Sequence, residues 1–267
     1  MSNSLPAKTP ENEKLTIELE RLNLIFLDLY TRHKEMVENE TLLLTSLYLD
    51  KLGRHQLELL EKQTEAARLK MTMHLIQAAI NRDEKPNLEA IKQEIEARMQ
   101  YYYAQIQEQS EAIEHAKDVL SSLISAEESQ KLKELFRLLC KRLHPDLNPT
   151  QTEEEKDLFI RVKAAYDQQR LDELQTILLY LNSSDDKKSI QISISDKLEQ
   201  IKHLESQIDS LKLKIDQLLQ TFPFTMKELI FNEQLIERKQ TELQSQIAAA
   251  EEEIAKFTNI ISLMTDE

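Results

Sequence analysis

Apolar residues recur every three or four positions through most of the chain, which is the spacing that places them along one face of an α-helix. The first helical stretch covers residues 11–110, after a polar lead at residues 1–10 that we expect to be disordered. A turn is predicted at Asn81–Asn87, where Asn87 can cap the helix that follows. The helices on the two sides of this turn can pack together. The pattern therefore predicts an N-terminal helical hairpin or bundle, with a kink where Gly53, the only glycine, interrupts it.

A coiled-coil pattern occupies residues 195–267. Apolar residues there alternate between spacings of three and four, as in the seam of a coiled coil. The seam positions are Ile201, Leu204, Ile208, Leu211, Ile215 and Leu218, then Ile236, Gln240, Leu243, Ile247, Ala250, Ile254, Phe257 and Ile261. The sequence TFPFT at Thr221–Thr225 separates the two groups, so we predict an antiparallel coiled-coil hairpin. Each helix alone would expose its seam to water, so the helices must pair with each other or with a partner chain. Residues 183–194 are a linker by composition.

Two shorter helices are predicted between these arms, joined by a loop that contains His144-Pro145-Asp146. Pro145 ends the first helix, because it lacks a backbone N–H and disfavours the α conformation at the preceding residue. Thr152, with a glutamate three residues later, predicts a capping box that starts the second helix. The apolar stripes of the two helices are Leu132, Leu135, Phe136, Leu139 and Leu143, and Leu158, Phe159, Val162, Ala165 and Tyr166. We expect antiparallel helices with the tripeptide at the mouth of the loop, facing solvent.

Basic residues follow the opposite face of the first of these helices. Lys133, Arg137 and Lys141 recur every four residues, and Arg142 lies beside them. Cys140 precedes His144 by one helical turn and could in principle act with it as a nucleophile. No third orienting group or oxyanion-hole donor accompanies the pair, so no catalytic residue is predicted. A role in contacting a partner suits His144 better.

The stretch from Lys131 to Tyr166 resembles the J-domain of the DnaJ family, whose hallmark is His-Pro-Asp between its second and third helices. The second helix of that family commonly reads aromatic-Arg-Arg-Leu-Ala-Lys-Lys-Tyr, and the sequence FRLLCKRL at Phe136–Leu143 fits most of those places. The third helix commonly reads Phe-x-x-Ile-Asn-Glu-Ala-Tyr. The residues in register with it are Phe159, Val162, Ala165 and Tyr166.

The chain departs from the family pattern at several places. Leu143 stands where the family usually has Tyr or Trp, and an apolar helix that could brace the domain replaces the charged fourth helix. The family's first helix is expected within Glu111–Leu120, where Asp118-Val119-Leu120 is similar to the Tyr-x-Val-Leu-Gly start but lacks its aromatic residue and glycine. A J-domain-like unit is therefore expected over residues 111–182.

The resemblance implies a co-chaperone that binds the ATPase domain of a DnaK-type heat-shock chaperone and speeds its ATP hydrolysis. In that role Asp146 would offer its carboxylate to an arginine of the partner, and Pro145 would fix the loop before docking. The basic residues would attract an acidic surface. The expected chaperone-binding residues are His144, Pro145, Asp146, Lys133, Arg137, Lys141 and Arg142.

Composition narrows the class and the partners. A single glycine, 5% aromatic residues and 31% charged residues in a chain of 267 favour long helices with thin cores. The net charge of −14 repels a phosphate backbone, so no nucleic-acid partner is expected. No apolar run reaches membrane-spanning length, and the N-terminal residues lack an apolar signal segment. We therefore expect a soluble cytoplasmic protein with no membrane partner.

The single cysteine, Cys140, rules out an intrachain disulfide and the cysteine-rich zinc module of longer DnaJ-type proteins. The remaining histidines are scattered without metal-ligand spacing, so neither a metal nor another cofactor is expected. The chain also lacks a glycine-rich phosphate loop and is not expected to be an enzyme itself.

Together these patterns predict an all-α protein in which long helical hairpins or antiparallel coiled coils flank a small J-domain unit. The flanking helices would bind a client protein, direct the protein to a location, or pair with a second copy of the chain in a homodimer. The alternative is a coiled-coil structural or scaffold protein whose J-like segment is an interaction module without chaperone activity.

Overall fold

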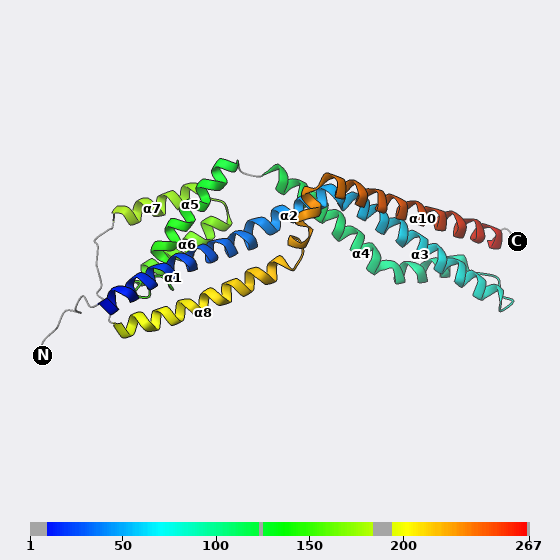
Figure 1. Ribbon diagram of the computed structural model, residues 1–267. Coiled ribbons are helices and arrows are strands. Elements are labelled where there is room, and N and C mark those ends of the chain that lie inside the picture. The colour runs from blue at the N-terminus through cyan, green and yellow to red at the C-terminus, as the bar shows by residue number, and fades with distance from the viewer. Residues whose placement is uncertain (1–9, 123–124, 184–193, 266–267) are drawn as a thin grey trace. The chain divides into compact units, whose positions relative to one another are not determined.

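The computed structural model describes residues 10–122, 125–183 and 194–265, and Figure 1 shows their arrangement. These residues form helices and their connections and no strand, so the all-α prediction is confirmed. The helices are α1 (Pro10–Glu35), η1 (Met36–Glu40, π-helical), α2 (Thr41–Tyr48), η2 (Leu49–Gly53, π-helical), α3 (Arg54–Ile80), α4 (Leu88–Ser121), α5 (Ala126–Leu143), α6 (Glu153–Asp167), α7 (Leu171–Ser183), α8 (Ile194–Leu219), η3 (Phe224–Met226, 3₁₀), α9 (Lys227–Phe231) and α10 (Glu233–Thr265). Within the described ranges, none of the helices combines the length and the apolar character that crossing a bilayer would need.

The chain divides into two compact units. The first unit contains residues 10–42, 125–183 and 194–224, and the second contains residues 43–122 and 225–265. The division falls inside α2, so each unit combines an N-terminal segment with segments from later in the chain.

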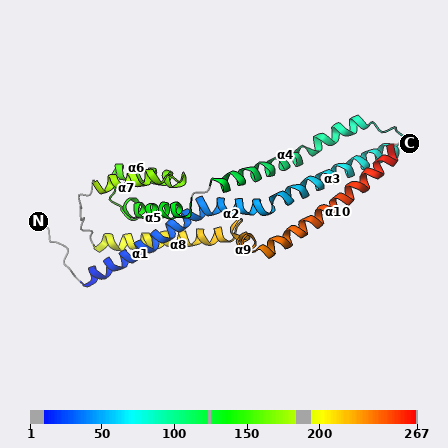
Figure 2. The same ribbon diagram turned by 90° about the horizontal axis from the view of Figure 1, so that it is seen from above.

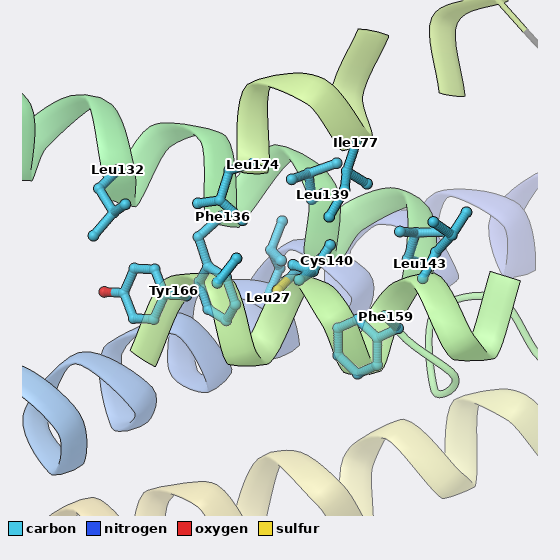
Figure 3. Packing of buried hydrophobic residues seen from close by; sticks show 13 residues of the cluster. Leu27, Leu132, Phe136, Leu139, Cys140, Leu143, Phe159, Tyr166, Leu174 and Ile177 are labelled. Carbon is cyan, nitrogen blue, oxygen red and sulfur yellow. The ribbon is translucent and has the colours of Figure 1, made fainter. Parts of the chain in front are cut away.

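The first unit is built around α5, α6 and α7, with α1 beside α5 and α8 beside α1 (Figures 1 and 2). Figure 3 shows the core of this unit, in which Leu27 of α1 joins residues of α5, α6 and α7. The rings of Phe136 and Tyr166 stack with centroids 4.0 Å apart. Phe159, earlier in α6, contacts His144 at the end of α5, and Tyr166, later in α6, contacts Phe136 earlier in α5, so the two helices run antiparallel, as the sequence predicts. Leu174 and Ile177 of α7 complete the core, so α7 braces the pair.

Local sequence determines where α5 and α6 begin and end. The capping box predicted at Thr152 and Glu155 is present at the start of α6, and a second one, of Ser125 and Glu128, starts α5. The helix α5 ends at Leu143, and His144 adopts an extended conformation before Pro145. This is the ending that the proline predicts.

In the second unit, α3 packs against both α4 and α10 (Figure 2). The α3–α4 pairing across the turn after Ile80 is the hairpin expected from the sequence. Leu52 of η2 lies in a core with Ile236 and Leu243 of α10. The Lys62 ammonium of α3 lies 2.7 Å from the Glu251 carboxylate of α10. A π-helical segment, η2, ends at Gly53, the residue at which the sequence predicts a kink.

The C-terminal helices do not form the single hairpin predicted over residues 195–267. The seam of α8 is buried in the first unit by Leu19, Leu22 and Phe26 of α1, and α10 packs along α3 in the second unit. A heptad pattern shows that a helix has an apolar stripe, but it does not identify which other stripe will cover it. The segment predicted as an N-terminal bundle, residues 11–110, is also divided between the two units. Its apolar stripes, too, are covered by helices from later in the chain.

The predicted first helix of the J-like unit also lies elsewhere. Residues 111–120 belong to α4, which buries Ile113 and Ala116 in the second unit, where it packs on α3 and η2. Residues 111–182 are therefore not one unit. The match at Asp118–Leu120 was weak, because it lacks the aromatic residue and the glycine of the family pattern. In the first unit, the helix that packs on α5 from earlier in the chain is α1. The predicted linker at residues 183–194 and the predicted disordered lead at residues 1–10 lie almost wholly outside the described residues.

The close approach of η2 and α4 generates a test of the second unit. A Cβ atom added at Gly53 would lie 2.9 Å from Cγ1 of Ile113, so a larger side chain must push the two segments apart. We expect Gly53→Val to lower the free energy of unfolding by about 1–3 kcal/mol, measured by urea denaturation. The exposed Lys70→Val change in α3 is the control and should cost less than Gly53→Val. Equal costs would contradict the close packing.

Candidate functional site

The tripeptide lies in a turn that is fixed by its own backbone. The N–H of His144 donates to the carbonyl of Cys140 at 2.8 Å and closes α5. The carbonyl of His144 then accepts from the N–H groups of Leu147 at 3.1 Å and Asn148 at 2.9 Å. The amide side chain of Asn148 also donates to the carbonyl of Lys141 at 3.2 Å. These hydrogen bonds hold the loop in one conformation before any partner binds.

The imidazole of His144 is buried, with only 7% of the residue exposed. It packs edge-on against rings of Phe26 and Tyr30 from α1 and Phe159 from α6, with centroid distances of 4.8, 4.4 and 5.1 Å. The prediction that the loop presents this imidazole to solvent is therefore wrong. The reason is the position of α1, a helix more than a hundred residues earlier in the chain, which lies over the end of α5. Pro145 itself is exposed.

Burial sets the protonation state of this imidazole. It lowers the pKa of His144 to about 4, aided by the positive charge of Lys163 and opposed by the carboxylate of Asp146. The ring is therefore neutral at pH 7. Its Nδ1 accepts from the N–H of Asp146 at 3.1 Å, which assigns the proton of the neutral ring to Nε2.

The carboxylate of Asp146 faces α8. Its Oδ1 lies 3.1 Å from Nε2 of His203, and the Asp146 side chain is about one quarter exposed, at 26%. The residue that is expected to meet an arginine of a partner thus already has a hydrogen-bonding neighbour within its own chain.

The predicted basic face is divided among several neighbours. Lys133 forms an ion pair with Glu35 of α1 at 2.7 Å, and Arg137 forms one with Asp28 of the same helix. Lys141 is exposed on this face, near the tripeptide. Arg142 instead donates to Oδ1 of Asn182 in α7 at 2.7 Å and belongs to a different side of the helix. Lys133, Arg137 and Lys141 thus follow one side of α5 towards the tripeptide, and Arg142, next to Lys141, turns towards α7.

Glu35 is a shared acceptor at the edge of this surface. Burial alone would raise the pKa of Glu35, but hydrogen bonds from Lys133, Tyr166 and Asn39 outweigh burial and lower the pKa below its usual value. The hydroxyl of Tyr166, one of the residues in register with the J-domain pattern, donates to this carboxylate. Ionised Glu35 thus connects α1 to both α5 and α6.

Sequence reasoning missed the residues that α1 and α8 contribute to this site. They are Phe26, Asp28, Tyr30, Glu35 and His203. Four of these residues lie within residues 26–35, but Arg32 and Lys34 balance the two carboxylates there, so the charge of the segment does not mark it as the complement of a basic helix. The sequence contained no indication that these two segments pair.

Cys140 is buried in the core beside this loop. Burial raises the pKa of the Cys140 thiol well above its usual range, so the thiol stays protonated in the core. Throughout the residues that the structure describes, no cluster of three His, Cys, Asp or Glu side chains could hold a metal ion.

Comparison with protein-family models, with curated proteins and with solved structures found no significant match for this chain.

The buried neutral imidazole predicts a pH dependence of stability. The pKa of His144 is about 4 when folded and about 6.5 when unfolded, so the unfolded chain binds more protons between these values. Stability should therefore fall as the pH falls from about 6.5 towards 4, by on the order of 2–3 kcal/mol from this residue. Urea denaturation of the wild-type chain at pH 7, 6, 5 and 4 measures the slope.

The control for this prediction is His144→Gln, which removes the titrating group and should flatten that part of the profile. The comparison uses the slopes and not the absolute stabilities, because the substitution itself changes packing. Identical slopes for the two proteins would show that His144 is not the buried neutral group described above.

Proposed function

We propose that the protein is a J-domain-type co-chaperone that binds a DnaK-type heat-shock chaperone and stimulates its ATPase. The observation that supports this most is the placement of His144-Pro145-Asp146 in a hydrogen-bonded turn between antiparallel helices α5 and α6. Lys133, Arg137 and Lys141 lie on the same side of α5. The sequence resemblance to the J-domain covers the same two helices.

In this proposal the loop acts as a rigid contact and not as a catalyst. Exposed Pro145 and the turn around it need little further ordering, which reduces the entropy lost on docking. The carboxylate of Asp146 would pair with an arginine of the chaperone in a charge-assisted hydrogen bond. The cations of α5 would steer the chain towards an acidic surface.

The remaining parts of the proposal concern the rest of the chain. The long helices would serve client binding, location or association with a second copy, in the cytoplasm. The chain would need no cofactor and would perform no chemistry of its own, because the partner supplies the ATPase.

A second candidate is a structural helical scaffold in which the J-like segment is an interaction module without chaperone activity. The internal partners of the proposed contact residues favour it. His144 is buried, Asp146 faces His203, and Lys133 is paired with Glu35. In that case the role of the tripeptide would be structural: its contacts would hold α1 and α8 against α5.

Single-turnover ATP hydrolysis by a DnaK-type chaperone separates the candidates. The co-chaperone proposal expects faster hydrolysis with the wild-type chain and loss of most of the stimulation with His144→Gln or Asp146→Asn. Asp146→Asn removes the charge while keeping the shape of the side chain. Asp157→Asn, the same change at an exposed position of α6, is the matched control and should keep the stimulation.

The same assay includes Asp28→Lys. This change removes the acidic partner of Arg137 and places a second positive charge beside it, so that α1 no longer pairs with this proposed contact residue. Circular dichroism of each variant checks that it remains helical. If neither the wild-type chain nor Asp28→Lys stimulates any of several DnaK-type chaperones, the co-chaperone proposal fails and the scaffold remains.

A further inference from the structure

The helix α1 runs antiparallel along the basic side of α5. Glu35, at the end of α1, pairs with Lys133 in the first half of α5. Asp28, which is earlier in α1, pairs with Arg137, which is one turn later in α5. Further towards the start of α1, Glu20, Asn23, Leu24 and Leu27 line a groove with Lys141, Leu147 and Asn148. The acidic side chains of α1 thus occupy the same cations that an acidic partner would use.

Aromatic residues of α1 also cover the histidine of the tripeptide. Phe26 and Tyr30 lie one helical turn apart and contact the imidazole of His144, and together with Phe159 they leave it 7% exposed. A partner that reaches this imidazole must first move Phe26 and Tyr30.

The helix α8 extends the cover to Asp146, through His203. It is joined to α1 by a continuous apolar seam. The buried residues of that seam are Leu19, Leu22, Phe26, Ile201, Leu204, Ile208 and Leu211. Lys197 of α8 also donates to Asn12 and Thr16 of α1, at 2.7 Å each. Because this seam is long and apolar, α1 and α8 are expected to move as a pair.

The contact between α1 and α5 is much thinner than this seam. Leu27 is the buried residue through which α1 enters the core of α5, α6 and α7, with Tyr30 partly buried beside it. In the Asp28–Arg137 ion pair the side chains are 57% and 48% exposed, so water screens their attraction. Separating α1 from α5 breaks the contacts of Leu27 and the ring contacts of Phe26 and Tyr30, whereas separating α1 from α8 breaks the whole apolar seam.

The end of α1 next to η1 is fastened more firmly than the part over the tripeptide. Lys34 forms an ion pair with Asp167 of α6 at 2.7 Å, and Asn39 of η1 donates to the hydroxyl of Tyr166 at 3.3 Å. The cover is thus held to α6 at one end, and Tyr30, which contacts His144, lies one helical turn before the anchored Lys34. Opening at His144 therefore requires α1 to swing about this end.

We propose that the α1–α8 pair is an autoinhibitory cover, which competes with an acidic partner for the cations of α5 and for the His144 loop. This inference rests on the proposed co-chaperone function. The covered chain is the form described here, and the partner engages the chain after the pair has moved away from α5. The surface fits an acidic partner segment that presents carboxylates to Lys133 and Arg137 and aromatic side chains to His144, as α1 does in the covered chain.

The cover can be tested without any chaperone, by the reaction of histidines with diethylpyrocarbonate. This reagent acylates accessible neutral imidazoles, and peptide mass spectrometry gives the rate at each histidine of the full chain. We expect His144 to react much more slowly than the exposed His115 in the wild-type protein. Asp28→Lys should speed the reaction at His144 by roughly fivefold, since it replaces an exposed ion pair with a repulsion.

The matched control is Glu18→Lys. It makes the same change in charge on α1, at a residue whose carboxylate pairs with Arg21 of its own helix. It should leave the reaction at His144 unchanged. Leu27→Ala, which shortens the buried contact between α1 and α5, is a second release variant and should also speed the reaction.

ATPase stimulation measured on the same proteins decides what the cover does. The proposal expects stimulation to rise with the reactivity of His144, so Asp28→Lys and Leu27→Ala exceed the wild-type chain and Glu18→Lys equals it. If the wild-type chain stimulates, and either His144 reacts no faster in both release variants or the wild-type chain stimulates as strongly as they do, the cover is not inhibitory although the co-chaperone function stands. If His144 reacts faster and no protein stimulates, the co-chaperone function fails, and the inhibitory role fails with it.

Discussion

The packing of α1 across the end of α5 determines the character of the whole candidate site. It places Phe26 and Tyr30 on the imidazole of His144, and it places acidic side chains beside Lys133 and Arg137. Without this contact the tripeptide would be an exposed loop at the end of a basic helix. With it, the same residues are part of a core, and burial keeps the imidazole neutral by lowering its pKa. The cost of burying a polar ring is limited because its Nδ1 keeps a hydrogen bond from the N–H of Asp146.

The contact of α1 with α8 is more extensive than its contact with α5. This difference underlies the proposal that α1 and α8 together uncover the site on α5. The face towards α8 is an apolar seam, whereas the face towards α5 combines one buried leucine, aromatic edges, the exposed Asp28–Arg137 pair and the partly buried Glu35–Lys133 pair. Exposed ion pairs contribute little to stability but favour a particular register, so they can position a helix that is still able to leave. A contact of this kind suits a surface that is covered in one state and available in another.

Sequence reasoning succeeded where the determining interactions are local. The end of α5 follows from Pro145, the start of α6 follows from Thr152 and Glu155, and the core of these helices follows from their apolar spacing. It failed where the interaction joins distant segments. Heptad spacing identified the seam of α8 but assigned it to a neighbour in sequence, because apolar stripes of the same period are interchangeable until shape and charge select between them. The burial of His144 could not be predicted for the same reason, since it depends on where α1 lies.

Zero-length crosslinking tests the central contact most directly. A carbodiimide joins a lysine amine to a carboxylate only when the two are in contact, and Nζ of Lys133 lies 2.7 Å from the carboxylate of Glu35. The account predicts a crosslinked peptide pair containing Lys133 and Glu35 in the monomeric fraction of the wild-type chain. Glu35→Gln should lack it while keeping a crosslink between Lys34 and Asp167, whose side chains are also 2.7 Å apart. If the Lys34–Asp167 crosslink forms in the wild-type chain and the Lys133–Glu35 crosslink does not, α1 does not lie on α5, and the covered site described here is contradicted.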